Sequence, residues 1–182
     1  MRKLFGLLLL AVMIVSLGSC SSSTDADSNN TNQDPIVGTW VAEGFSTVGS
    51  VSVANVSPLL YAAPFRTRRI QAVFNANGTY TVTTTDSAGT NATLTGTWSS
   101  TAADTAGITI RNIVVNQTSP SSVTSTGIYQ SNTSGSSTSL LYEIVQTTPP
   151  LVGVTPPTPR RGFGSSSNGA FGISLIQRYQ KQ

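Results

Sequence analysis

The sequence contains no histidine and only one cysteine among its 182 residues. Ser-His-Asp and Cys-His catalytic arrangements need an imidazole base, and zinc sites draw mainly on His and Cys ligands. These absences exclude most nucleophilic catalysis and most metal centres, so we expect no enzyme activity, no metal site and no cofactor. A lone cysteine forms no disulfide within the chain, so the stability of the fold must come from strand pairing and core burial.

Charged residues are also scarce, at 9% of the chain, and the formal net charge is +3. Arg2 and Lys3 contribute two of the positive charges from the extreme N-terminus. Without them, eight basic side chains face seven acidic ones. Apart from two short arginine clusters these charges are scattered, which is a poor footprint for nucleic acid. We therefore expect no nucleic-acid partner.

Few carboxylates are available for acid/base chemistry. In residues 35–182 they are Glu43, Asp86, Asp104 and Glu143. Asp86 and Asp104 lie in turn-like segments, which leaves Glu43 and Glu143 as the only pair for glycosidase-type catalysis. We favour the alternative that both glutamates face solvent from strands.

The first twenty residues have the parts of a secretory signal. Arg2 and Lys3 precede an apolar run over residues 4–15, which is too short to span a bilayer comfortably. Small residues follow, and Leu17-Gly18-Ser19-Cys20 resembles the lipobox of bacterial lipoproteins. The resemblance implies that residues 1–19 are removed and that Cys20 carries the lipid, with palmitate among its acyl groups. An ordinary signal peptide with a chance cysteine is the alternative.

Residues 20–34 are almost entirely polar and cannot bury enough surface to fold, so we expect a disordered tether. The folded domain is then residues 35–182, a common size for one domain. Ser21 and Ser22 replace the aspartate that retains many enterobacterial lipoproteins inside. The segment thus predicts a lipid-anchored protein of the bacterial cell envelope, in the outer membrane.

After residue 20 the pattern is that of β-strands. Threonine alternates with apolar residues, and no helical stripe of ten or more residues occurs. Asn77-Gly78 supplies a hairpin turn. Between Ile110 and Ile113 the apolar residues change from even to odd positions, and this shift in strand parity predicts a bulge or bend near Arg111. Residues 46–64 should form a loop with a short helix or lid, and residues 149–170 a long exposed loop. The predicted strands are 36–45, 70–74, 79–84, 90–99, 108–115, 123–131, 139–147 and 171–179.

About eight strands joined mostly by short turns favour an all-β fold. An antiparallel up-and-down barrel is the expected architecture, because closure removes the exposed edges. A two-sheet β-sandwich is the alternative, since strand counts do not distinguish the two. We expect a monomer.

Three short motifs are similar to those of bacterial lipocalin-like lipoproteins. They are Gly38-Thr39-Trp40, the stretch from Phe74 to Tyr80 with Gly78 between them, and Gly96-Thr97-Trp98. The resemblance covers about residues 35–115. It implies a barrel that holds a small apolar ligand, with Trp40 plugging the closed end and Arg178 packing across it. Arg178 has the opposite strand parity from Tyr179, so it would reach Trp40 only if a bulge intervenes.

For the ligand site, we expect Phe74, Tyr80 and Trp98 on the inner face. Arg66 and Arg68 share the face of Ile70 and could receive an anionic head group at the mouth. The alternative is that aromatic side chains fill the barrel completely and that these arginines form a solvated loop cluster.

A second class of function is a structural or surface-interaction lipoprotein. Its Ser/Thr-rich exterior and the loop with Arg160 and Arg161 would contact other envelope components. Asp86-Ser87-Ala88 and Asp104-Thr105-Ala106 also resemble an O-glycosylation acceptor of Bacteroidota, although chance matches are common in a chain with 26 serines and 26 threonines.

Overall fold

The computed structural model of this protein describes residues 33–182. The expected signal peptide, the lipid-bearing Cys20 and nearly all of the expected tether lie outside this range. Residues 33–182 belong to one compact unit, and their buried core side chains extend from Ile36 to Tyr179. The unit therefore has the core of a domain that folds by itself. No helix in this described range is long and apolar enough to cross a membrane.

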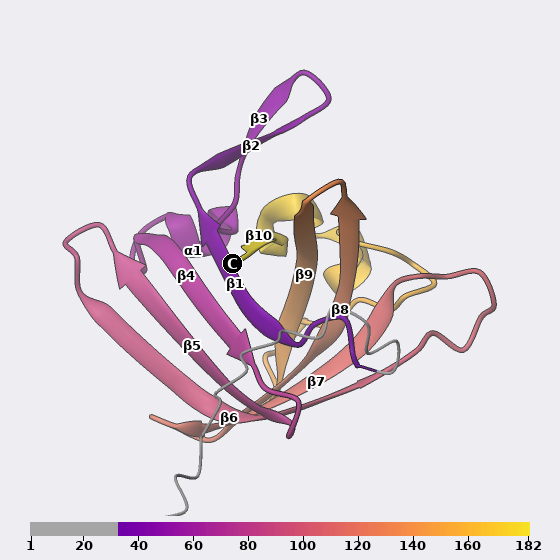
Figure 1. Ribbon diagram of the computed structural model, residues 1–182. Coiled ribbons are helices and arrows are strands. Elements are labelled where there is room, and N and C mark those ends of the chain that lie inside the picture. The colour runs from indigo at the N-terminus through magenta and orange to yellow at the C-terminus, as the bar shows by residue number, and fades with distance from the viewer. Residues whose placement is uncertain (1–32) are drawn as a thin grey trace, which may run out of the picture. The chain divides into compact units, whose positions relative to one another are not determined.

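Strands dominate the domain, with short helical turns in its connections (Figure 1). The strands are β1 Gly38–Glu43, β2 Phe45–Val48, β3 Val51–Ala54, β4 Thr67–Phe74, β5 Thr79–Asp86, β6 Asn91–Thr101, β7 Arg111–Ser119, β8 Val123–Ser134, β9 Ser137–Thr148 and β10 Gln177–Lys181. The helical turns are α1 Pro58–Tyr61, η1 Ser166–Gly169 and η2 Gly172–Leu175.

Eight of these strands close into an antiparallel barrel in the order β1-β10-β9-β8-β7-β6-β5-β4. Closure comes from β1, which pairs with β10 through Trp40 and Val41 and with β4 along its whole length. The predicted all-β class and up-and-down barrel are confirmed, and the sandwich alternative is not adopted. No barrel strand is left with an unpaired edge, which suits a domain without disulfides.

The alternation of apolar and polar residues in the sequence correctly identifies side chains that point into the barrel. In β4, Ile70, Ala72 and Phe74 are buried, and Tyr80 is buried at the start of β5. Between these strands Gly78 adopts a φ of 79°, and its amide donates to the Asn75 carbonyl over 3.0 Å. The Asn-Gly turn is thus the predicted one, because a positive φ at this bulge position favours glycine.

The glycines of the two G-x-W motifs are explained by close approaches. A Cβ on Gly96 would lie 2.0 Å from the Asn116 carbonyl oxygen, next to the register shift between β6 and β7. Gly38 has a φ of 135°, and a Cβ there would lie 2.9 Å from a side-chain carbon of Lys181. A larger residue at position 96 would push β7 away from β6, whereas at position 38 the positive φ is what favours glycine, because the Lys181 side chain can move aside.

The connection from β1 to β4 contains an element that the sequence analysis missed. The short helix expected in residues 46–64 is α1, but β2 and β3 form a separate hairpin in front of it. In Figure 1 this hairpin projects away from the barrel. Strand alternation was obscured here by glycine and serine at the turn of a very short hairpin.

Several predicted strands differ from the structure at their ends, and two of these differences have a clear local cause. The final strand begins at Gln177 instead of 171, because Gly172, with a φ of 48°, lies in the turn η2 that interrupts the alternation. Likewise β7 begins at Arg111, so the parity shift near this residue marks the start of a strand and not a bulge. The bulges of the barrel lie elsewhere, at register shifts in the β4–β5, β6–β7 and β8–β9 pairs.

A polar network ties the start of the domain to the barrel wall. The Asp34 carboxylate accepts hydrogen bonds from the Tyr129 hydroxyl at 2.5 Å, from Ser100 and from the Ile36 amide at 3.1 Å. Arg111 forms an ion pair with Asp34 at 3.1 Å and donates to the Tyr129 hydroxyl at 2.8 Å. Asp34, which the sequence analysis assigned to the tether, therefore holds β6, β7 and β8 together.

Burial acts against ionisation of Asp34, but the hydrogen bonds from Ser100, Tyr129 and Ile36 and the charge of Arg111 outweigh it. The pKa of Asp34 consequently lies below its ordinary value of 3.8. Burial raises the pKa of Tyr129, and the adjacent Asp34 adds to that effect, so its hydroxyl remains a donor.

We predict that Asp34→Asn lowers the free energy of unfolding by about 1.5–3 kcal/mol at neutral pH, the usual contribution of a hydrogen bond to a charged group. Because the folded pKa is depressed, this contribution is complete above the unfolded value of 3.8 and is lost as the pH falls through the folded value. The difference from wild type in urea unfolding should therefore shrink below about pH 4. Asp104→Asn, in an exposed turn, is the matched control, and a pH-independent difference would contradict the prediction.

Candidate functional site

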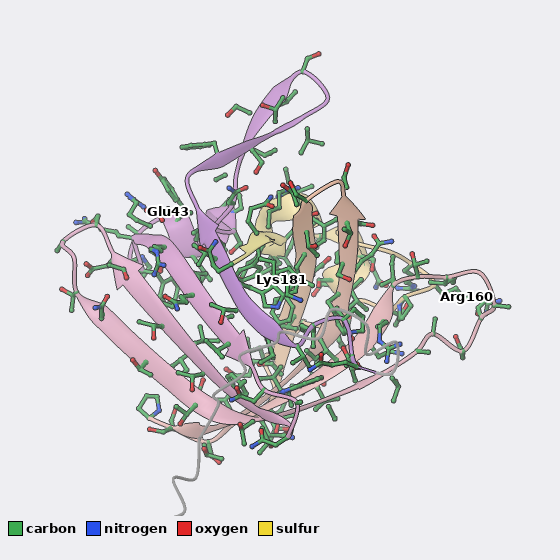
Figure 2. All side chains as sticks on the ribbon, in the orientation of Figure 1. Glu43, Arg160 and Lys181 are labelled. Carbon is green, nitrogen blue, oxygen red and sulfur yellow. The ribbon has the colours of Figure 1, made fainter. Side chains whose placement is uncertain are left out.

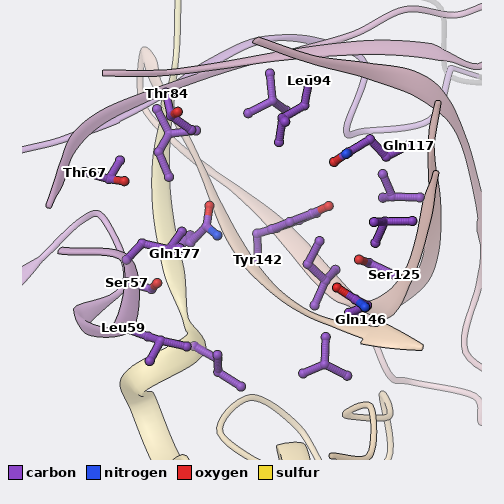
Figure 3. A pocket seen from close by; sticks show the side chains of 18 of the residues that line it. Ser57, Leu59, Thr67, Thr84, Leu94, Gln117, Ser125, Tyr142, Gln146 and Gln177 are labelled. Atoms are coloured by element: carbon purple, nitrogen blue, oxygen red, sulfur yellow. The ribbon is translucent and has the colours of Figure 1, made fainter. Parts of the chain in front are cut away.

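The two ends of the barrel are built differently. The closed end carries the start of β1 and the connections 75–78, 102–110 and 135–136, and the open end carries the turns 87–90 and 120–122 and the long connections 44–66 and 149–176. At the open end lies a cavity of about 530 Å³. It descends into the barrel as far as Phe74, Tyr80 and Tyr142, and it is the candidate functional site (Figure 3).

Aromatic rings form the floor of the cavity. The Phe74 ring lies 6.1 Å from the ring of Tyr80 and 6.2 Å from that of Tyr142. Tyr142 in turn contacts Tyr179 edge-on at 6.1 Å. These rings come from β4, β5, β9 and β10, so barrel closure is what brings them together. They offer a ligand rigid apolar faces.

The polar groups of the cavity are all uncharged. Tyr142 extends across the middle, with its hydroxyl directed to the side where Gln117 and Ser125 lie (Figure 3). Gln177 lies on the other side, where its side-chain oxygen accepts a hydrogen bond from the Tyr179 hydroxyl. Among the described residues that line the cavity, none is Asp, Glu, Lys or Arg. The site therefore offers hydrogen bonds but no counter-charge.

The tyrosines at the floor stay protonated. Burial raises the pKa of Tyr80 and of Tyr179. It raises the pKa of Tyr142 well above 10, and the neighbouring Tyr179 and Tyr80 add to the shift. Each hydroxyl can thus both donate and accept a hydrogen bond across the physiological pH range.

Only two of the three aromatic residues expected at the ligand site line the cavity. Phe74 and Tyr80 line the cavity, whereas Trp98 is not part of its lining. Trp98 packs edge-on against Phe74 at 5.7 Å, and its indole N–H donates to the carbonyls of Asn75 and Thr79, each at 3.1 Å. It holds the β4–β5 turn against β6 at the closed end.

The two arginines expected at the mouth also lie outside the lining. The Arg68 guanidinium lies 3.8 Å from the centre of the Tyr61 ring, and its Nη1 donates to the Tyr61 carbonyl at 2.8 Å. Arg66 is exposed, with a φ of 51° that is unusual outside glycine and asparagine. Neither arginine faces the cavity, so Arg68 instead fixes α1 to the start of β4.

At the closed end, Trp40 is completely buried and donates its indole N–H to the Ile36 carbonyl at 2.6 Å. The cation over its ring is Lys181, whose Nζ lies 5.5 Å from the ring centre. Lys181, labelled in Figure 2, pairs directly with Trp40 in the β1–β10 ladder. Arg178 lies at the start of β10, where its amide donates to the Asn55 carbonyl at 2.8 Å. No bulge in β10 brings Arg178 onto the face of Trp40.

Asn55 holds the α1 side of the mouth in place. Its Nδ2 donates to the Glu43 carbonyl at 2.7 Å, and its backbone amide donates to the Gly44 carbonyl at 2.9 Å. With the bond from Arg178, these contacts connect the end of β1, the end of β3 and the start of β10. Nothing in the local sequence marks Asn55, because its partners are backbone groups brought together only by folding.

The connection 149–176 forms the other side of the mouth, and it is held by a buried carboxylate. Glu143 is completely buried on β9 and accepts hydrogen bonds from the Gly164 amide at 2.6 Å and from the Ser166 hydroxyl at 2.5 Å. The expectation of a long exposed loop was wrong for part of the segment, since Pro157 and Pro159 are buried while Arg160 is exposed. Proline and serine composition alone did not show that a carboxylate on the barrel wall would bind the loop.

The two glutamates considered as a catalytic pair have different environments. Glu43, at the end of β1 (Figure 2), is exposed and forms an ion pair with Arg69 at 3.3 Å. Glu143 instead contacts the loop, so it is not the solvent-facing residue that we expected. Within residues 33–182, no cluster of three or more metal-ligating side chains occurs.

No protein-family model, curated protein or solved structure matches this chain. The closed eight-stranded antiparallel barrel fits a lipocalin-like fold. Its function must therefore be argued from the cavity and from the chemistry around the mouth.

We predict that Glu143→Ala frees the loop around residue 160 from the barrel wall, because it removes the acceptor for Gly164 and Ser166. Limited trypsin digestion should then cleave after Arg160 or Arg161 at least several-fold faster than in wild type. Arg160 lies at the periphery of the view in Figure 2 and is exposed. Glu43→Ala is the matched control and should leave this cleavage unchanged. Equal cleavage in both variants would show that Glu143 does not hold the loop.

Proposed function

We propose that this protein is a lipid-anchored lipoprotein of the bacterial cell envelope whose barrel binds a small, uncharged, apolar molecule and does not catalyse a reaction. The observation that carries the proposal is the cavity at the open end. Its volume of about 530 Å³ lies within the usual range for small-molecule sites, roughly 300–1,000 Å³. A barrel filled by its own side chains, as in a purely structural lipoprotein, would leave no such space.

The absence of counter-charges in the lining supports an uncharged ligand. A carboxylate buried without a cation loses several kcal/mol of solvation free energy. Arg66 and Arg68 lie outside the lining, so a fatty-acid head group inside the cavity would not reach them. The Tyr142 hydroxyl and the side chains of Gln117 and Ser125 are suited to an alcohol, ester, ketone or amide.

The proposed location depends on the N-terminal sequence. The lipobox-like Leu17-Gly18-Ser19-Cys20 supports cleavage before Cys20 and lipid attachment to it, and Ser21 and Ser22 favour the outer membrane. A monomeric state is supported by barrel closure, because no barrel strand is left with an edge to pair with another copy.

We predict that Leu94→Trp weakens binding of the neutral fluorescent probe N-phenyl-1-naphthylamine at least ten-fold, because the indole would occupy part of the cavity. Leu94 lines the cavity from β6, while the adjacent Thr93 is exposed on the same strand. Thr93→Trp is therefore the matched control and should bind the probe like wild type. Fluorescence titration of purified residues 32–182 measures both. Unchanged binding in Leu94→Trp, or no probe binding by wild type, would contradict the proposed site.

We also predict that dodecanol displaces the probe at least ten-fold more effectively than dodecanoate at neutral pH, since only the carboxylate leaves a charge unpaired in the cavity. Lowering the pH toward the pKa of the fatty acid should narrow this difference, because the protonated acid is neutral. Tyr142→Phe, which retains the ring and removes the hydroxyl, should weaken dodecanol binding more than that of dodecane. Equal displacement by the alcohol and the carboxylate would refute an uncharged ligand class.

A further inference from the structure

The large apolar side chains that are exposed to solvent gather at one end of the domain. All eight lie in the two long connections of the open end, 44–66 and 149–176, and within residues 33–182 the closed end has none. We call this set the apolar rim. Its members are Phe45, Val48, Val51, Leu59, Phe65, Leu151, Val152 and Ile173. Such a one-sided concentration marks an interaction surface.

The apolar rim is continuous with the cavity. Leu59, Phe65 and Leu151 are between 45% and 56% exposed, and they also line the cavity. The two connections touch where α1 contacts η2. An apolar molecule that moves from outside the domain to the cavity floor therefore meets apolar side chains along the way.

The β2–β3 hairpin extends the apolar rim outward. Val48 and Val51 face each other across its turn and are 53% and 62% exposed. At its base, the Phe45 ring contacts the Tyr61 ring of α1 edge-on at 6.2 Å. A two-stranded ribbon of this size has little stability alone, and its exposed valines bury nothing inside the domain.

Positive charge accompanies the apolar rim. Arg66 adjoins Phe65 and is exposed, and Arg68 lies against Tyr61. Arg69 is neutralised by its ion pair with Glu43. Within residues 33–182, two other acidic side chains lie near this end. Asp86 accepts hydrogen bonds from the amides of Ala88 and Thr90 in its own turn, and Glu143 is completely buried beneath the connection 149–176. Apolar side chains beside arginines match the boundary between acyl chains and anionic headgroups.

We propose that the open end docks on a lipid bilayer with anionic headgroups and that ligand passes between the bilayer and the cavity through the apolar rim. The passage of ligand rests on the function proposed above, whereas the docking does not. A second copy of the chain fits this surface less well, because a two-fold contact would place the arginines of one copy against those of the other.

The position of the first described residues permits docking on the membrane that holds the proposed anchor. Asp34 is bound at the closed end and lies fourteen positions after Cys20 in the sequence. Fourteen residues span at most about 50 Å. The longest strands, β8 and β9, have 12 residues each and span roughly 40 Å along their tilted path. The chain is therefore long enough to run from the closed end back past the barrel.

The test uses single cysteines, because residues 32–182 contain none. Val51→Cys on the hairpin and Ala102→Cys at the closed end, both exposed, are each labelled with an environment-sensitive nitrobenzoxadiazole. With phosphatidylcholine vesicles containing about 30% phosphatidylglycerol, the label at position 51 should brighten and shift to the blue, and the label at position 102 should not. No change at position 51, or an equal change at position 102, would overturn the docking.

Two further variants distinguish the contribution of positive charge to vesicle binding from that of ligand binding. Arg66→Asn keeps a residue that tolerates a positive φ, and it should weaken binding to the anionic vesicles by about five-fold. Vesicles of phosphatidylcholine alone should bind this variant and wild type equally. If the label at position 51 responds without vesicles while sedimentation shows a dimer, the occupant is a second copy and the proposal fails.

Leu94→Trp distinguishes docking from ligand binding. The substitution lies inside the cavity, so vesicle binding should match that of wild type even though probe binding is weakened at least ten-fold. Transfer of N-phenyl-1-naphthylamine from the protein to vesicles should accelerate with vesicle concentration in wild type. Transfer that is independent of vesicle concentration would indicate release through water and would refute direct passage while leaving the cavity's function intact.

Discussion

The pairing of β1 with both β4 and β10, the next and the last barrel strands in sequence order, is the constraint on which the rest of the structure depends. Gly38 to Glu43 pair with β4, and Trp40 and Val41 pair with β10. This double pairing turns a meander into a closed barrel. It also sets Trp40 inside the closed end, with Lys181 over its ring, so that the largest fully buried side chain lies where the first and last barrel strands meet.

Closure creates an asymmetric molecule. At the closed end, Asp34, Ser100, Arg111 and Tyr129 form a charged network around an aliphatic and aromatic core. At the open end, long connections leave an uncharged cavity lined mainly by aliphatic side chains and aromatic rings, with a few amides and hydroxyls. The polar groups that hold these connections, Glu143 and Asn55, bind backbone atoms outside the cavity lining. The polar groups that stabilise the fold therefore lie apart from the polar groups that face the cavity.

Much of the barrel could be predicted because its signals are local. The alternation through Ile70, Ala72 and Phe74 identified the interior face, and Asn77-Gly78 identified the turn. The site was predicted less well, because it depends on partners distant in sequence. Phe74 and Tyr80 lie in the cavity as their parity indicated, whereas Tyr142 and Gln117 carry no motif and enter the site only through the order of strands around the barrel.

Trp98 and Arg68 have contacts that local sequence patterns could not predict. Trp98 has the expected parity, but the closed-end turn captures its indole N–H and keeps it out of the cavity. The Arg68 guanidinium packs on the ring of Tyr61, which belongs to α1. The position of this helical turn depends on contacts across the mouth. The sequence by itself determined the all-β class, the presence of the eight barrel strands and most of their inward faces, because alternation and turn chemistry act over a few residues. Only the tertiary structure decided that the barrel holds a cavity and which side chains line it, because interior volume depends on how strands far apart in the chain close around it.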